Sequence, residues 1–154
     1  MIRFTFTSDS TVSSTTLVYN VKDYAFNCKP RPTGCALSAS VNELNLMIDE
    51  DDCRVVYLEG YCPHMGWESQ QLVVPHIVRR ALFAEFDEEP IPGVSRRVSG
   101  EARWSTLVDP CSGWVCIGNS EVVGDYVEFA PGCVAGLLKG ELISLWLKPE
   151  ALPY

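Results

Sequence analysis

Carboxylates are the residues best placed to do chemistry in this 154-residue chain, and they gather in two runs. The segment from Glu43 to Glu59 holds six acids and one base, a local charge of −5. A second acidic run extends from Glu85 to Glu89. Such runs either keep a loop in solution or attract a cationic partner and orient it. We predict an acidic surface that docks a basic protein.

Two other functions remain open for this chain, whereas calcium binding does not. A calcium loop beginning at Asp49 is excluded, because the sequence lacks Gly at the sixth and Glu at the twelfth position. A small-molecule binding domain or hydrolase with paired carboxylates in a sheet-lined cleft stays possible, since carboxylate separation is invisible in a sequence. It predicts a pocket containing Asp or Glu with a raised pKa. Self-association through an exposed strand edge is the remaining alternative.

The residues used for nucleophilic or metal chemistry form no motif. Cys62 stands two positions before His64, but Pro63 between them imposes an extended geometry, and no third residue is placed to orient the pair. The seven cysteines contain no Cys-x-x-Cys spacing, so we expect packed thiols and no metal site. We therefore predict a protein that is not an enzyme, with no catalytic residue and no cofactor.

Composition and charge narrow the class of partner. The net charge of −8 disfavours direct binding to nucleic acid, whose phosphates attract basic proteins. The longest apolar runs are far shorter than the roughly 20 residues of a membrane helix. The N-terminal segment has no basic stretch followed by an apolar run, so we expect a cytoplasmic protein that does not bind membranes. The length suits a single domain over residues 1–154.

Period-two alternation predicts the strands that would position the carboxylates. Leu44–Ile48 alternates in this way, Asp49–Asp52 supplies turn residues, and Cys53–Tyr61 is rich in β-branched and aromatic residues, which together predict a hairpin. Glu141–Leu147 is apolar on both faces, which is typical of a strand in the middle of a sheet.

One segment predicts a helix. Pro75 suits a first helical position, and an apolar stripe, broken by one glutamate, runs from it to Phe86. With eight to ten strands and short turns elsewhere, we expect a mainly β (α+β) protein: an antiparallel β-sandwich or partial barrel with one helix packed on it. The stripe consists of Ile77, Val78, Ala81, Leu82, Glu85 and Phe86.

Several segments of the chain carry a family resemblance. The stretches Trp104–Gly118, Val127–Gly132 and Leu142–Pro149, with the predicted hairpin arm Val55–Pro63, resemble small bacterial immunity proteins encoded beside polymorphic toxins. These include the immunity proteins of contact-dependent growth inhibition systems. The resemblance covers about half of the chain and involves structural residues. It implies a cytoplasmic inhibitor that binds the C-terminal domain of one toxin, often a basic nuclease, and blocks its active site.

No contact residue is carried over from the family, so the toxin-binding surface is predicted from charge and position alone. Three aromatic residues follow the acidic turn closely, and aromatic anchors within a charged rim are common in tight interfaces. The predicted toxin-binding residues are Asp49, Glu50, Asp51, Asp52, Tyr57, Glu59, Tyr61, Trp67, Asp87, Glu88 and Glu89.

Overall fold

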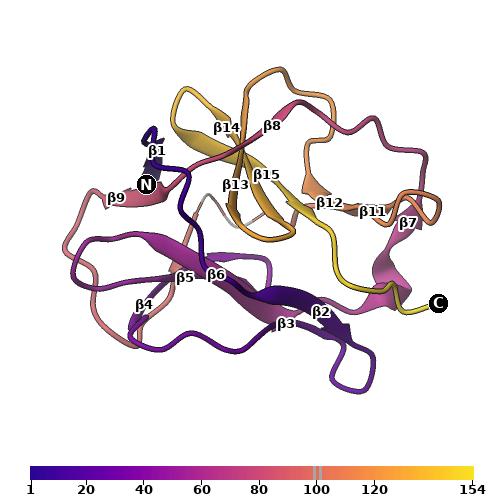
Figure 1. The fold of residues 1–154 in the computed structure, drawn as a ribbon, viewed down its shortest axis with the longest axis horizontal. Helices are drawn as coiled ribbons and strands as arrows, with labels where there is room; N and C mark the ends of the chain where they lie inside the picture. The colour runs from indigo at the N-terminus through magenta and orange to yellow at the C-terminus, as the bar shows by residue number, and fades with distance from the viewer. Residues whose placement is uncertain (99, 101) are drawn as a thin grey trace.

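A computed structural model describes residues 1–98, 100 and 102–154, and these form a mainly β protein with two large sheets that face each other (Figure 1). The prediction of a mainly β fold is confirmed. In spatial order, the six-stranded sheet contains β10 (Arg96–Arg97), β4 (Leu37–Val41), β5 (Leu44–Ile48), β6 (Val55–Tyr61), β3 (Ala25–Lys29) and β2 (Thr16–Asn20).

The second large sheet has seven strands, and a two-stranded ribbon lies beside both sheets. The ribbon pairs β1 (Ile2–Phe6) with β9 (Leu82–Phe86). In spatial order, the seven-stranded sheet contains β7 (Glu68–Ser69), β11 (Thr106–Val108), β12 (Val115–Gly118), β15 (Glu141–Leu147), β14 (Cys133–Leu138), β13 (Asp125–Ala130) and β8 (Ile77–Arg79).

The sheets are mixed, whereas the sequence predicted antiparallel ones. Their interior strands pair antiparallel, as hairpins do. The short edge strands β10, β7 and β8 instead pair parallel with β4, β11 and β13. Each of these edge strands is reached through a longer connection that returns the chain in the same direction. A strand of two or three residues is too short to show an alternating pattern, so the sequence does not reveal this long-range pairing.

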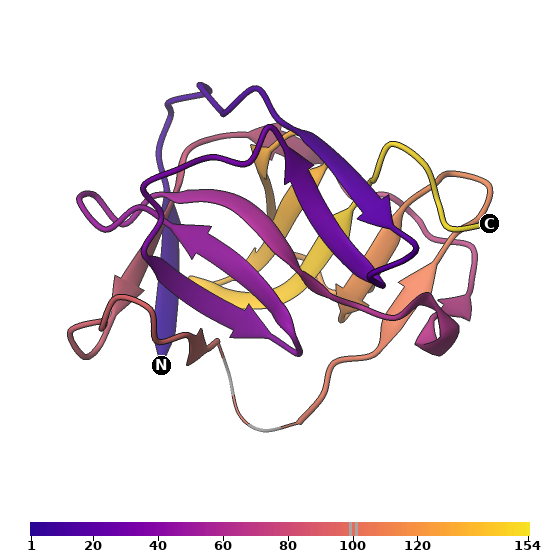
Figure 2. The ribbon, with the colours of Figure 1, turned by 90° about the horizontal axis from the view of Figure 1, so that it is seen from below.

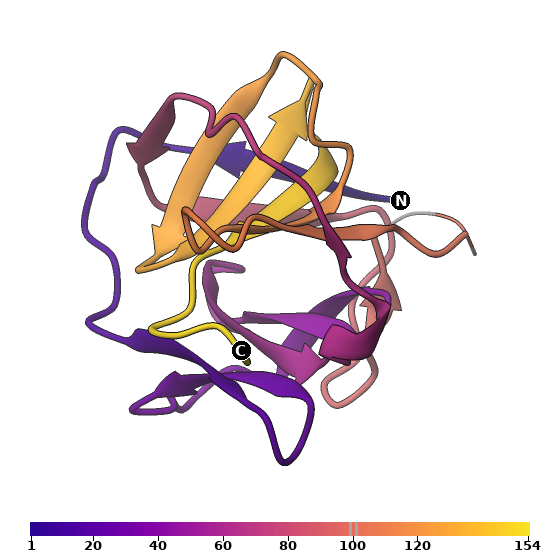
Figure 3. The same cartoon turned by 90° about the vertical axis from the view of Figure 1, so that its right-hand side faces the viewer.

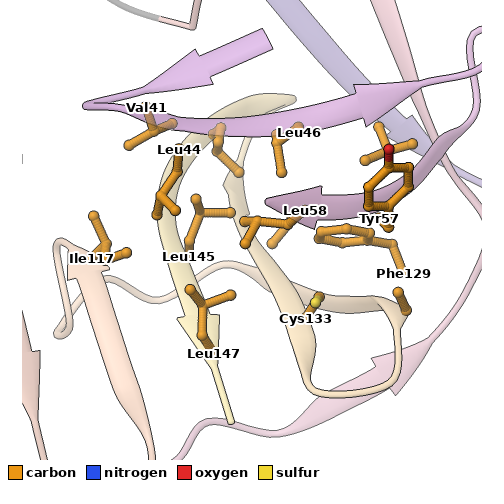
Figure 4. Close-up of a cluster of buried hydrophobic side chains, with 14 of the residues drawn as sticks. Val41, Leu44, Leu46, Tyr57, Leu58, Ile117, Phe129, Cys133, Leu145 and Leu147 are labelled. Carbon is orange, nitrogen blue, oxygen red and sulfur yellow. The ribbon is translucent and has the colours of Figure 1, made fainter. Parts of the chain in front are cut away.

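Side chains from both sheets fill the space between them. Along β5, Leu44, Leu46 and Ile48 point inward and are almost fully buried. They belong to the same buried cluster as Leu145 and Leu147 of β15, and Figure 4 shows Leu44 and Leu46 pointing toward these two leucines. Since each leucine or isoleucine stabilises the fold by roughly 1.5–3 kcal/mol on burial, this shared core holds the two sheets together.

The seven-stranded sheet is also covered on its outer face. Trp146 of β15 is fully buried there and lies between Cys116 of β12 and Val134 of β14. The segment 70–76, here called the strap, connects β7 at one edge of this sheet with β8 at the other, and its Leu72 packs on this outer cluster. The prediction that Glu141–Leu147 is a middle strand is therefore confirmed.

The predicted hairpin is confirmed as β5 and β6 with the acidic turn between them. The β1–β9 ribbon lies between this turn and the other sheet (Figures 1 and 3). The Phe4 N–H donates to the Gly140 carbonyl at 2.8 Å, and the Ala84 N–H donates to the Cys53 carbonyl at 2.9 Å. The ribbon thus fixes the acidic turn relative to the seven-stranded sheet.

The predicted helix over Pro75–Phe86 is wrong. The segment forms β8 and β9, and the single helical turn in the described ranges is a 3-10 turn, η1 (His64–Gly66). β8 pairs with β13 and β9 pairs with β1, so partners distant in sequence supply the backbone hydrogen bonds that a helix would form locally. Within the described part of the chain, no helix has the length and apolar character needed to cross a bilayer.

Candidate functional site

The acidic turn between β5 and β6 uses two of its four carboxylates to hold its own backbone. One Asp49 carboxylate oxygen accepts a hydrogen bond from the Asp51 N–H at 2.8 Å, and one Asp52 oxygen accepts from the Arg54 N–H at 3.0 Å. These local bonds are the reason that aspartate is favoured in turns. Glu50 and Asp51 are exposed, and their carboxylates form no such bond, so they remain available to a partner.

Of the second acidic run, Glu85 lies in β9, and Asp87–Glu89 follow directly after this strand. Asp87 pairs with the N-terminal ammonium group of Met1, and this hydrogen bond lowers the pKa of the Asp87 carboxyl. Glu88 lies 3.8 Å from the Arg96 guanidinium, which also donates to the Glu89 carbonyl at 2.7 Å. Two of the three acids that follow β9 therefore have cationic neighbours, which reduces their effective charge.

The fold brings both acidic runs to the same end of the molecule. The turn is bonded to β9 through Cys53 and Ala84, and the loop after β9 is bonded to Ala36 through the Gly93 N–H at 3.0 Å. Both segments lie at the left-hand end in Figures 1 and 2. Runs that are about 35 residues apart in sequence thus lie at one end of the fold, here called the acidic end (Asp49–Asp52 and Asp87–Glu89).

The aromatic residues predicted to join this surface do not reach it. Tyr57 is only 2% exposed and packs in the core, because it points inward from β6 like Val55. Tyr61 is 48% exposed but lies at the far end of β6 from the turn. Trp67 is only 9% exposed, and Glu59 pairs with Arg31 at 2.9 Å, away from the acidic end. The structure thus separates these four residues from the seven acids.

Cys62 and His64 do not form a nucleophile and its base. The thiol lies against the indole of Trp67 and the hydroxyl of Thr106, and burial is the main cause of its raised pKa. The imidazole of His64 instead packs edge-on against Tyr19 with 5.9 Å between ring centroids. The Tyr19 hydroxyl donates to the Cys62 carbonyl at 2.8 Å and accepts from the backbone N–H of His64 at 3.1 Å. These two bonds hold the loop from Cys62 to His64 in a packed position.

The shifted carboxyl groups do not fit general-acid catalysis. In the described residues the pKa is clearly shifted for Asp9, Asp87 and Asp109, in each case downward. A general acid needs the opposite shift, because it must hold its proton near neutral pH. The paired-carboxylate hydrolase therefore gains no support. Within the same residues, no three His, Cys, Asp or Glu side chains gather as they would around a metal ion.

A second surface, which the sequence did not predict, lies at the other end of β5. It is a cleft of about 360 Å³ where the β4–β5 turn meets β7 and β11. Tyr61, Trp67 and Trp104 line it, together with the ion pair between Glu43 and Arg103. Arg103 and Trp104 precede a short strand and are 60 residues or more from the turn that they contact, so no local pattern could identify them.

Comparison with known proteins adds no family. No protein-family model matches the chain, and no curated protein matches it either. The chemistry of the acidic end and of the cleft therefore carries the functional argument.

Proposed function

We propose that this protein is an immunity protein that binds a basic toxin domain through its acidic end and blocks the toxin's active site. One observation carries the proposal: two acidic runs far apart in sequence share one end of the fold. In the chain as described, none of the four turn carboxylates forms an ion pair. The neighbouring Arg54 is directed elsewhere, toward Asp9 at 3.8 Å and the Thr11 carbonyl.

The mechanism is steric and electrostatic. Unpaired carboxylates on a protruding turn attract Lys and Arg residues that a nuclease uses to hold phosphates, and they orient the encounter. Glu50 and Asp51 carry this role, because Asp49 and Asp52 already accept backbone hydrogen bonds. The rigid connection of the turn to β9 presents these two carboxylates in a fixed position, which limits the entropy lost on binding.

The test uses the C-terminal toxin domain encoded in the neighbouring reading frame. Co-expression with this protein should rescue growth, and association measured by stopped flow should slow as salt rises. The double change Glu50→Lys and Asp51→Lys should lower the association rate at low salt by about 10-fold or more, because steering raises on-rates by this order. It should also make the rate less dependent on salt.

A control variant separates local charge from total charge. Glu121→Lys with Glu150→Lys makes the same change in net charge, in the loop between β12 and β13 and in the segment after β15, and neither segment lies at the left-hand, acidic end in Figure 1. This variant should associate at nearly the wild-type rate. Equal slowing by both double variants, or unchanged kinetics of the Glu50/Asp51 variant at low salt, would remove the acidic end from the mechanism.

A further inference from the structure

The cleft beside the β4–β5 turn has a defined shape, because hydrogen bonds and close packing hold its walls. The Asn42 side-chain amide donates to the Trp104 carbonyl at 3.0 Å and accepts from the Trp104 N–H at 3.0 Å. The Trp104 ring lies directly over Gly118, where a Cβ atom would come within 2.8 Å of it. Trp104 is therefore fixed from both sides and forms a preformed wall.

The opposite wall belongs to an aromatic cluster that continues into the core. Trp67 stacks on Phe26 with 5.9 Å between ring centroids and meets Tyr19 edge-on at 5.0 Å. Tyr61, which is half exposed, extends this wall toward the solvent. A side chain entering the cleft would thus lie among aromatic rings, which attract cations through the negative potential over the ring.

The rim of the cleft carries more negative than positive charge. The Glu43 carboxylate holds the Arg103 guanidinium through contacts of 2.7 and 2.9 Å, so the rim already binds one guanidinium group. The Glu68 carboxylate is exposed at the same cleft and, in the described part of the chain, has no cationic partner. The overall charge of −8 favours a cationic ligand further.

We propose that this cleft binds the side chain of an arginine from a basic polypeptide. The arginine stem and guanidinium plane lie among Tyr61, Trp67 and Trp104, and the charge pairs with Glu68. Arginine fits better than lysine because its planar group stacks on aromatic rings and bonds a carboxylate through two N–H groups. The volume of about 360 Å³ leaves room for one such side chain and its neighbouring backbone.

This site is separate from the acidic end and does not depend on the proposed function. Strand β5 lies between the two, and its five residues span roughly 17 Å at the usual rise per residue. One extended basic partner could contact both surfaces, but each binds through its own residues. The two proposals can therefore fail independently of each other.

The test is a titration with N-acetyl-arginine amide, followed by NMR of the indole N–H resonances. Trp67 and Trp104 are the reporters, because both side chains line the cleft. Arginine amide should shift both resonances. The citrulline analogue has the same shape but no charge and should bind about tenfold more weakly, because it lacks the cation.

Two variants and a control locate the effect. Glu68→Gln and Tyr61→Ala change exposed side chains and should each weaken arginine binding about fivefold. The matched variant Glu121→Gln and the Glu50/Asp51 double variant should bind arginine amide as the wild type does. The spectrum itself reports whether each variant is folded. Equal binding of citrulline and arginine amides, or no shift of either indole resonance, would overturn the assignment.

Discussion

The position of Trp104 depends on Asn42, and this dependence gives a quantitative prediction. Asn42 lies in the left-handed region of backbone space, with φ at 52°, and its amide makes two hydrogen bonds to the Trp104 backbone. Replacing it with glycine keeps the backbone conformation and removes both bonds. At about 0.5–1.5 kcal/mol for each bond, Asn42→Gly should lower the free energy of unfolding by about 1–3 kcal/mol.

The alanine variant should be worse than the glycine variant. Alanine loses the same two hydrogen bonds and also pays about 1 kcal/mol or more for a left-handed conformation. Each 1 kcal/mol shifts the melting temperature of a chain of this size by about 2–4 °C, so Asn42→Gly should melt about 2–12 °C below the wild type. Urea unfolding followed by tryptophan fluorescence measures both free energies directly.

A result within about 0.5 kcal/mol of the wild type for Asn42→Gly would refute this reasoning, because that is the range of neutral surface changes. An alanine variant as stable as the glycine variant would contradict the backbone argument alone. Since Asn42 positions one wall of the cleft, Asn42→Gly should also weaken the binding of arginine amide. These readouts separate loss of stability from loss of the site.

Two further predictions concern the seven-stranded sheet and the strap. The Asp109 carboxylate accepts hydrogen bonds from the backbone N–H groups of Leu72, Cys111 and Ser112, and these bonds lower its pKa in the folded protein. The ionised carboxylate therefore stabilises the fold above the unfolded-state pKa of about 3.9, and this stabilisation is lost as the pH falls through the folded-state pKa. Thermal melts from pH 7 to pH 2 should therefore show a smaller acid-induced drop for Asp109→Asn than for the wild type; equal drops would exclude this role. Gly136→Ala would place a Cβ atom 2.2 Å from the Ser144 hydroxyl oxygen, and this overpacking should destabilise the protein by about 1–3 kcal/mol. Adding Ser144→Gly should recover part of that loss in chemical denaturation, and a fully stable Gly136→Ala variant would contradict the packing described.

The sequence predicted elements whose pairing is local. The β5–β6 hairpin follows from alternation on both sides of a turn rich in aspartate, and all of its partners lie within 20 residues. β15 was predicted as a central strand because apolar residues on both faces need cover on both faces. In each case the local pattern and the final environment agree.

The segment Pro75–Phe86 was predicted wrongly because the pairing of its strands is not local. Its helical stripe arises because two short strands follow each other, with Ala81 at the junction between them. Within β9 the residues Leu82 and Ala84 are buried alternately, which is a strand pattern. A strand of three to five residues is too short for its period-two alternation to be distinguished from the period of a helix. The partners that decide the matter, β1 and β13, are far away in sequence.

The acidic end was only partly visible in the sequence. Its seven acids are plain to read, but which of them stay free depends on turn geometry: Asp49 and Asp52 accept backbone hydrogen bonds, while Glu50 and Asp51 do not. Tyr57 was expected at the surface, although its inward register with Val55 indicates the core. The cleft could not be predicted, because Asn42 and Trp104 meet only through folding.

The strap ties the two outermost strands of the seven-stranded sheet to each other. It is anchored midway, because the Leu72 N–H donates to the Asp109 carboxylate at 3.0 Å and the Leu72 side chain packs on the outer cluster. Residues inserted on either side of Leu72 would leave this anchor in place, whereas removal of Leu72 would uncover Trp146 and its neighbours. Natural variants of this chain should therefore differ in the length of the strap around Leu72 and keep an apolar residue at the anchor.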